Sequence, residues 1–276
     1  MKLIVVFATA LATSAGAQHP APLPPEPEPQ IQDNSFLIEE AYNQPPGVVQ
    51  HINAFFLDRE ADSWAYTFTQ EWPLFSQRHQ VSYTVPVERN GSPFGTGLGD
   101  VALNYRYQVP TGRDATFAVA PRLSLLLPTG EVAKARGAGG AGLQANLPVS
   151  VMIARSLVTH FNIGATYTPS TENSAGDQTP TTGFNAGQSV IWLLRPALNL
   201  MLEVAWNRTE EVVEGGKRAR SDGLLLSPGI RAALNLSSGL QIVPGIAFPI
   251  GIGPSDGERS AFFYLSLEHP FAKSTK

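Results

Sequence analysis

The residue types that could do chemistry are few, and none of them forms a recognisable catalytic, metal or phosphate motif. His160 and Ser150 fall on neighbouring predicted strands, but no G-x-S-x-G turn frames the serine, and a polar strand histidine is the simpler interpretation. GTGLGD at 95–100 precedes a strand instead of the helix that a dinucleotide loop requires. GAGGAG at 137–142 lacks the Lys-Ser/Thr of a P-loop. We therefore expect no enzymatic activity, no catalytic residue, no cofactor and no metal site.

Isolated charged side chains occur on the polar face of segments in which apolar and polar residues alternate. Charges of both signs on one face could form a polar constriction that selects solutes. They could equally form ion pairs that brace the wall, since an unpaired buried charge is costly. Both interpretations stay open. The residues predicted to line a lumen are Glu71, Arg78, Asp100, Arg106, Arg122, Glu203, Arg231 and Glu268.

The elements that must position these charges are strands. From Leu198 to Asn207, apolar and mostly polar residues alternate, which is the two-residue period of a strand, and no convincing amphipathic helix appears from Val48 onward. Strands of soluble proteins run to about 5–6 residues, whereas a tilted strand that crosses a bilayer needs about 9–11. Twelve segments show the pattern, most of them long enough to cross: 48–56, 64–72, 78–85, 97–109, 114–127, 139–154, 157–168, 182–193, 197–208, 221–234, 239–250 and 259–271.

The connections between these segments differ in length. Every second connection is short, for example RS at 155–156, and the others are mostly longer and rich in Gly, Pro and charge, for example PTGEVAKARGAG at 128–139. This alternation is typical of an outer-membrane barrel with short periplasmic turns and longer extracellular loops. The sequence thus predicts an all-β, antiparallel transmembrane β-barrel of about twelve strands over residues 48–276. A soluble secreted β-sandwich is the structural alternative.

The tryptophans support membrane spanning. Trp64 and Trp72 are eight residues apart on one segment, which corresponds to roughly 26 Å along a strand. If the strand is tilted by about 40°, this distance corresponds to a difference in height of about 20 Å across the membrane. This approaches the ~25 Å apolar band between the aromatic girdles of a barrel. We expect Trp64 and Trp206 at the outer girdle and Trp72 and Trp192 at the inner one; packing in a sandwich core is the alternative. The last segment alternates Phe263, Leu265 and Leu267 and resembles a barrel's C-terminal strand.

The N-terminal region indicates export. A basic Met1-Lys2, an apolar run at 3–12 and Ala15-Gly16-Ala17 predict a signal peptide over residues 1–17. Residues 18–47 then read as a Pro-rich periplasmic arm or plug segment, and simple disorder is the alternative. If this arm enters the barrel, Glu39 and Glu40 could pair with lumen arginines.

Composition limits the partners. The formal net charge is −4 with a pI near 5.7, which lacks the basic footprint of a nucleic-acid-binding protein. The chain contains no cysteine, so it has no disulfides and no thiolate chemistry.

Several stretches resemble one outer-membrane family. These are SFLIEEAYNQPPGVVQHI at 35–52, Gly97-Leu98-Gly99-Asp100 before a strand, and Leu127-Pro128-Thr129-Gly130 at the end of the next. They resemble the family labelled "meta-pathway of phenol degradation", also called putative transporters. The resemblance implies a β-barrel and the uptake of small hydrophobic compounds, and it carries no catalytic residue over to this chain.

The sequence therefore predicts a bacterial outer-membrane barrel for passive passage of a small, hydrophobic or aromatic solute. The expected partners are outer-membrane lipid, the assembly machinery of that membrane and a small-molecule solute. A structural or binding barrel without transport is the second hypothesis, and a barrel lipid hydrolase is the third.

Overall fold

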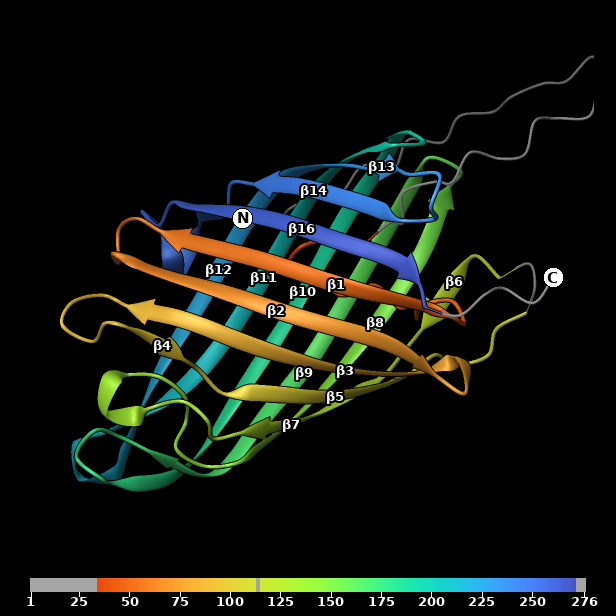
Figure 1. Ribbon diagram of the computed structural model, residues 1–276. Coiled ribbons are helices and arrows are strands. Elements are labelled where there is room, and N and C mark those ends of the chain that lie inside the picture. The colour runs from red at the N-terminus through yellow and green to blue at the C-terminus, as the bar shows by residue number, and fades with distance from the viewer. Residues whose placement is uncertain (1–33, 113–114, 272–276) are drawn as a thin grey trace, which may run out of the picture.

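The computed structural model describes residues 34–112 and 115–271, and in this part of the chain twelve antiparallel strands close into one barrel (Figure 1). The predicted fold class is confirmed. The signal peptide and residues 18–33 of the predicted arm lie outside the described residues. The strand segments are β1 (Val48–Asp58), β2 (Ser63–Leu74), β3 (Ser76–Asn90), β4 (Thr96–Leu98), β5 (Val101–Tyr107), β6 (Phe117–Val119), β7 (Arg122–Leu127), β8 (Gly142–Ala154), β9 (Leu157–Glu172), β10 (Gln178–Arg195), β11 (Leu198–Val213), β12 (Lys217–Ala232), β13 (Leu234–Asn235), β14 (Gln241–Ala247), β15 (Ile250–Gly251) and β16 (Ser260–Pro270).

The barrel is closed by two strand pairings. β1 pairs with β16 along its whole length, from Val48↔Pro270 to Asp58↔Ser260. β12 pairs with β14 and then with β15, which completes the ring. A closed sheet pairs its backbone groups with one another, and this is the condition for a sheet to survive in hydrocarbon, where no water can replace a missing partner.

Four of the predicted strands are interrupted, and one of them, 221–234, is broken only at Ala233 between β12 and β13. β4 and β5 are separated at Gly99-Asp100, β6 and β7 at Ala120-Pro121, and β14 and β15 at Phe248-Pro249. Pro121 and Pro249 have no backbone N–H, so the ladder loses a hydrogen bond where each of them stands. The short segment β13 continues β12 after Ala233 and pairs with β14 in the same register.

The hairpins at one end of the barrel continue as paired strands beyond the predicted boundaries. β11 reaches Val213 and β12 begins at Lys217, where the sequence predicted a loop. This end of the molecule, on the left in Figure 1, carries the longer hairpins. The described residues form only single turns of 3-10 helix: η1 (Val132–Lys134), η2 (Glu214–Gly216) and η3 (Gly253–Ser255). No described helix is long and apolar enough to cross a membrane.

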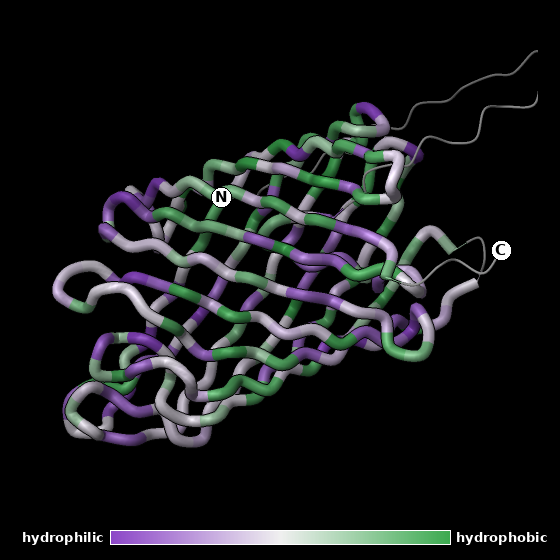
Figure 2. The backbone as a smooth tube through the Cα atoms, viewed as in Figure 1, coloured by the Kyte–Doolittle hydropathy of each residue, from purple (hydrophilic) through white to green (hydrophobic). Residues whose placement is uncertain are grey.

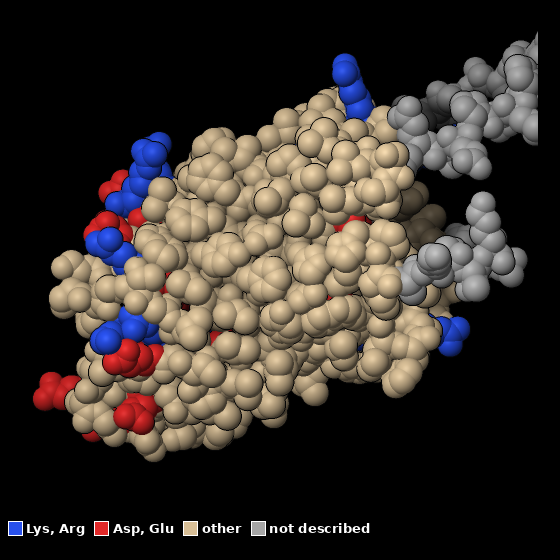
Figure 3. All heavy atoms as spheres, viewed as in Figure 1, with Lys and Arg blue, Asp and Glu red and all other residues tan. Residues whose placement is uncertain are grey.

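The two faces of the sheet differ in polarity. On β11, Asn199 and Glu203 point inward and are fully buried, whereas Leu202 and Val204 point outward and are 46% and 38% exposed. Figure 2 shows the same alternation of hydrophobic and hydrophilic residues along the strands. On the face in Figure 3, charged side chains gather at the ends, mostly at the end with the long hairpins, and the middle is nearly free of them. The outside therefore has the apolar belt that lipid requires.

We expect an arginine in this belt to destabilise the barrel strongly. Leu202→Arg should lower the free energy of unfolding by about 2–4 kcal/mol, the usual cost of placing this charge near the bilayer midplane. Val213→Arg, at the end of the same strand, should change the unfolding free energy by less than about 1 kcal/mol. Urea unfolding in lipid vesicles measures both variants. Equal effects of the two substitutions would contradict a lipid-facing position for Leu202.

Candidate functional site

Residues 34–47 precede β1 and lie inside the barrel, where one carboxyl group holds the start of the segment. The backbone N–H groups of Phe36, Leu37 and Ile38 all donate to Oε1 of Glu203, at 3.1, 2.8 and 3.1 Å. Glu203 projects inward from β11 and is completely buried. Buried backbone donors need partners, and here a wall side chain supplies one in place of a neighbouring strand.

The middle of the segment is bonded to the wall in the same way. Asn162 on β9 accepts from the Glu39 N–H and donates to the Glu39 carbonyl, both at 2.8 Å. The Ala41 N–H donates to Ser150 Oγ at 2.8 Å. The Gln44 N–H donates to Gln80 Oε1 at 2.8 Å. Amide and hydroxyl side chains on the inner face thus act as a fixed template for an extended chain.

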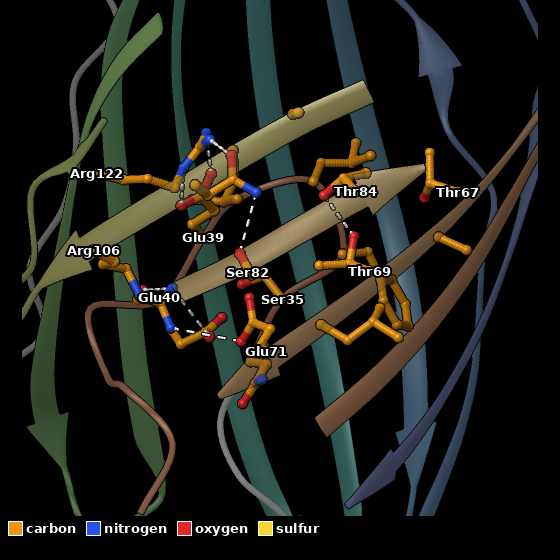
Figure 4. A pocket seen from close by; sticks show the side chains of 18 of the residues that line it. Ser35, Glu39, Glu40, Thr67, Thr69, Glu71, Ser82, Thr84, Arg106 and Arg122 are labelled. Carbon is orange, nitrogen blue, oxygen red and sulfur yellow. Dashed lines mark hydrogen bonds and ion pairs between the residues drawn. The ribbon is translucent and has the colours of Figure 1, made fainter. Parts of the chain in front are cut away.

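Ion pairs add to these contacts. Arg122 on β7 lies 2.6 Å from Glu39, measured from Nη2 to Oε1. Arg106 on β5 lies 3.7 Å from Glu40 and 3.9 Å from Glu71, and its Nη2 also donates to the Tyr42 carbonyl at 2.7 Å. Figure 4 shows both arginines reaching from the wall to the segment. The predicted pairing of Glu39 and Glu40 with lumen arginines is observed.

An aromatic contact fixes the first described turn of the segment. The Phe36 ring lies 5.2 Å from the rings of both Phe262 and Tyr264 on β16. A Cβ atom at Gly229 or Gly245 would approach the Phe36 ring to 2.8 or 2.5 Å, so glycine at these wall positions makes room for it. The wall is therefore shaped to fit this segment.

The segment leaves open space on both of its sides. A cavity of about 340 Å³ lies toward β1–β5 and is lined by Ile52, Phe262 and Tyr264 together with polar side chains. A second cavity of about 540 Å³ lies toward β8–β12, where Asn146 and Asn185 are among its lining residues. Leu37, Ile38, Glu39, Arg122 and Gln144 border both cavities. The segment and Arg122 thus stand between two parts of one lumen.

The predicted lumen residues occupy different heights of the barrel. Glu71, Arg106, Glu203, Arg231 and Glu268 are buried inside it, and Arg122 is partly exposed there. Asp100 lies at the long-hairpin end, where it accepts from the N–H groups of Gly130 and Ala138 and orders the connection after β7. Arg78 is exposed at the opposite end, close to the start of β3.

Other contact residues escaped the sequence reasoning because they are small or uncharged. Ser35 Oγ donates to Ser189 Oγ on β10 at 2.6 Å, and Gln50 donates to Glu268 at 2.8 Å. Ser189 lies on the polar, inward face of its strand. This position in the alternating pattern is the signal that could have identified it as a contact residue. Arg231 donates to the Asn34 carbonyl, which anchors the first described residue.

Ser150 and His160 are directly opposite one another on β8 and β9. Ser150 Oγ is 2.7 Å from His160 Nδ1, and neither side chain is exposed. The pair faces the lumen and is covered by residues 34–47, with the Ala41 N–H on the serine oxygen. This position does not suit attack on a lipid outside the barrel.

The four tryptophans all lie on the outward phase of their strands. Trp192 is 50% exposed. Trp64 stacks with Phe55 at 5.6 Å, Trp72 packs against Tyr83 at 5.6 Å, and the Arg208 guanidinium lies 5.6 Å from the centre of the Trp206 ring. Their assignment to outer and inner girdles stays a prediction.

Comparison with solved structures identifies the kind of barrel. An outer-membrane channel from Pseudomonas putida F1 superposes with a TM-score of 0.64 at 10% identity, over 83% of this chain and 97% of that one. This chain has an outer-membrane β-barrel fold. The NanC porin superposes with a TM-score of 0.52 at 7% identity, over 80% of this chain and 98% of the porin. No protein-family model matches the sequence, and no curated protein matches it significantly.

Proposed function

We propose that this chain is an outer-membrane channel for passive passage of a small solute, and that residues 34–47 are a resident plug. The observation that carries the proposal is the position of this segment between two cavities of one lumen. In this proposal the chain has no catalytic role. The buried, hydrogen-bonded state of the Ser150 hydroxyl supports that view.

The chemistry of the contacts supports a plug that can be displaced. Phe36 packs on Phe262 and Tyr264, and Ala41 packs on Ala118 and Ala120. The other contacts of the segment are mainly hydrogen bonds and ion pairs to wall side chains. Each such hydrogen bond contributes only about 0.5–1.5 kcal/mol net, because water can replace it once the lumen is wet. A segment that was part of the permanent core would instead bury apolar side chains along its whole length.

The smaller cavity supports a solute with both an apolar and a polar part. Ile52, Phe262 and Tyr264 form one side of it, and Asn104 and Arg122 lie on the other. A small aromatic compound with a polar group would contact both sides. This agrees with the solute class implied by the resemblance to the "meta-pathway of phenol degradation" family.

The proposed route to the membrane is export with removal of residues 1–17, followed by insertion by the outer-membrane assembly machinery. The apolar belt and the outward tryptophans support contact with outer-membrane lipid.

Substitution of Glu203 tests the plug. Glu203→Leu removes the oxygen that accepts from Phe36, Leu37 and Ile38, and each unpaired N–H costs about 1–3 kcal/mol. Since 1.4 kcal/mol is a factor of ten in an equilibrium, the fraction of time spent open should rise at least about tenfold. Conductance steps in a planar bilayer measure this fraction.

Glu211→Leu is the matched control, because Glu211 is exposed near the tip of the same strand. It should conduct like the unmodified chain. If the Glu203 variant is folded and yet as silent as the control, the open-pore proposal fails. The structural or binding barrel would then be the better account.

A further inference from the structure

Two histidines meet on the outside of the barrel, at the seam where the first and last strands pair. His51 lies on β1 and His269 on β16. Their Nε2 atoms are 3.2 Å apart, and their rings are stacked with centroids 5.3 Å apart. Neither residue contributes to the plug or to the two cavities of the lumen.

The hydrogen bonding of His269 decides which of its nitrogens is free to bind. Its Nδ1 lies 3.2 Å from the carbonyl oxygen of Pro270, and a carbonyl oxygen can only accept. The proton of His269 is therefore on Nδ1, and Nε2 presents a lone pair toward His51. Histidines that bind metals are usually oriented in this way, with the other ring nitrogen donating to a backbone carbonyl or a carboxylate.

The separation of the two nitrogens suits a single metal ion. Zinc binds histidine nitrogen at about 2.0–2.1 Å, and two such nitrogens at a near-tetrahedral angle are roughly 3.2–3.4 Å apart. The observed 3.2 Å is already within this range, so the two nitrogens need not separate. Binding requires the rings to turn so that both Nε2 lone pairs face the ion, and it requires the proton of His51 to move from Nε2, where it donates to His269, to Nδ1.

Room for further ligands exists beside His269, although His51 does not border it. A cavity of about 240 Å³ is lined by His269, Pro270 and Gln241, and it lies at the end of the barrel where β16 finishes. Among the described residues, no group of three or more His, Asp or Glu could hold a metal. Water would therefore complete the coordination.

We propose that His51 and His269 form a two-histidine site for a divalent transition-metal ion, which links β1 to β16. Bound metal closes the seam with a coordinate link in addition to the backbone ladder. Because the ion binds the folded barrel and the unfolded chain lacks this geometry, binding stabilises the fold.

The test uses the purified full chain and Zn²⁺. Thermal unfolding, followed by the change in gel mobility, should shift several degrees upward with Zn²⁺ and return with EDTA. Calorimetric titration should show one Zn²⁺ more per chain than in His51→Gln or His269→Gln. Glutamine keeps a hydrogen-bonding group at each position, and the unfolding temperature without metal verifies that each variant is folded.

His79→Gln is the matched control, because His79 also faces outward but pairs with the Tyr105 hydroxyl at 2.7 Å. This variant should keep both the extra Zn²⁺ and the thermal shift. Equal Zn²⁺ stoichiometry in the unmodified chain and the His51 variant, or a thermal shift that survives in it, would overturn the proposal. The two rings would then be a hydrogen-bonded pair only.

Discussion

A chain that begins at Val48 is expected to conduct continuously, with a current several times that of the full chain. Deleting the segment removes the structure that separates the cavities of about 340 and 540 Å³. It also exposes Glu203, Asn162 and Arg106, which water can then solvate. Planar-bilayer conductance of refolded protein measures the effect, and heat-modifiable gel mobility shows that the barrel has formed.

A chain that begins at Asn34 is the matched control, since it keeps every contact described for the segment. It should behave like the full chain. A synthetic peptide of residues 34–47, added to the Val48 variant, should reduce the current again because it restores the same hydrogen bonds. A folded Val48 variant that remains silent would show that the wall itself closes the lumen, which leaves a lateral route or a barrel without transport.

The strands were predictable because alternation is a local signal. Leu198 to Asn207 shows its two faces without any knowledge of neighbouring strands, and β11 contains that stretch. The strand ends were less predictable at the long hairpins. Glu210 lies beyond Trp206, and its carboxylate is held by Thr182 and Arg220 instead of by apolar neighbours. Pairing continues there without the alternation that reveals a strand.

The site was predictable only in part, for a related reason. Phase on a strand assigned Arg106 and Glu203 to the inner face, and the structure places both there. The alternating pattern shows that a side chain points inward, but it does not show which residue that side chain contacts. The contact of Glu203 with Leu37 joins residues 166 positions apart, and it depends on the path of a segment that has no periodic pattern of its own. Small partners such as Ser189 carry still less signal, since a serine fits either face of a strand.

A disulfide between positions 35 and 189 is expected to lock the plug in place. The two serine Oγ atoms are 2.6 Å apart, so cysteines at these positions approach the separation of about 2.05 Å that a disulfide needs. The chain has no cysteine of its own, so Ser35→Cys/Ser189→Cys can form only this intramolecular bond. Oxidised protein should show almost no current, even with Glu203→Leu added, and dithiothreitol should restore the current of that variant.

The mismatched pair Ser35→Cys/Ser150→Cys supplies the control. Ser150 bonds to Ala41 instead, six residues further along the segment, so this pair should not cross-link efficiently. Mobility on a non-reducing denaturing gel measures cross-linking in both variants. If the 35–189 disulfide forms fully and the current is unchanged, solute passes the segment without displacing it. The two cavities would then be a continuous path around Glu39 and Arg122, and residues 34–47 would line the channel instead of closing it.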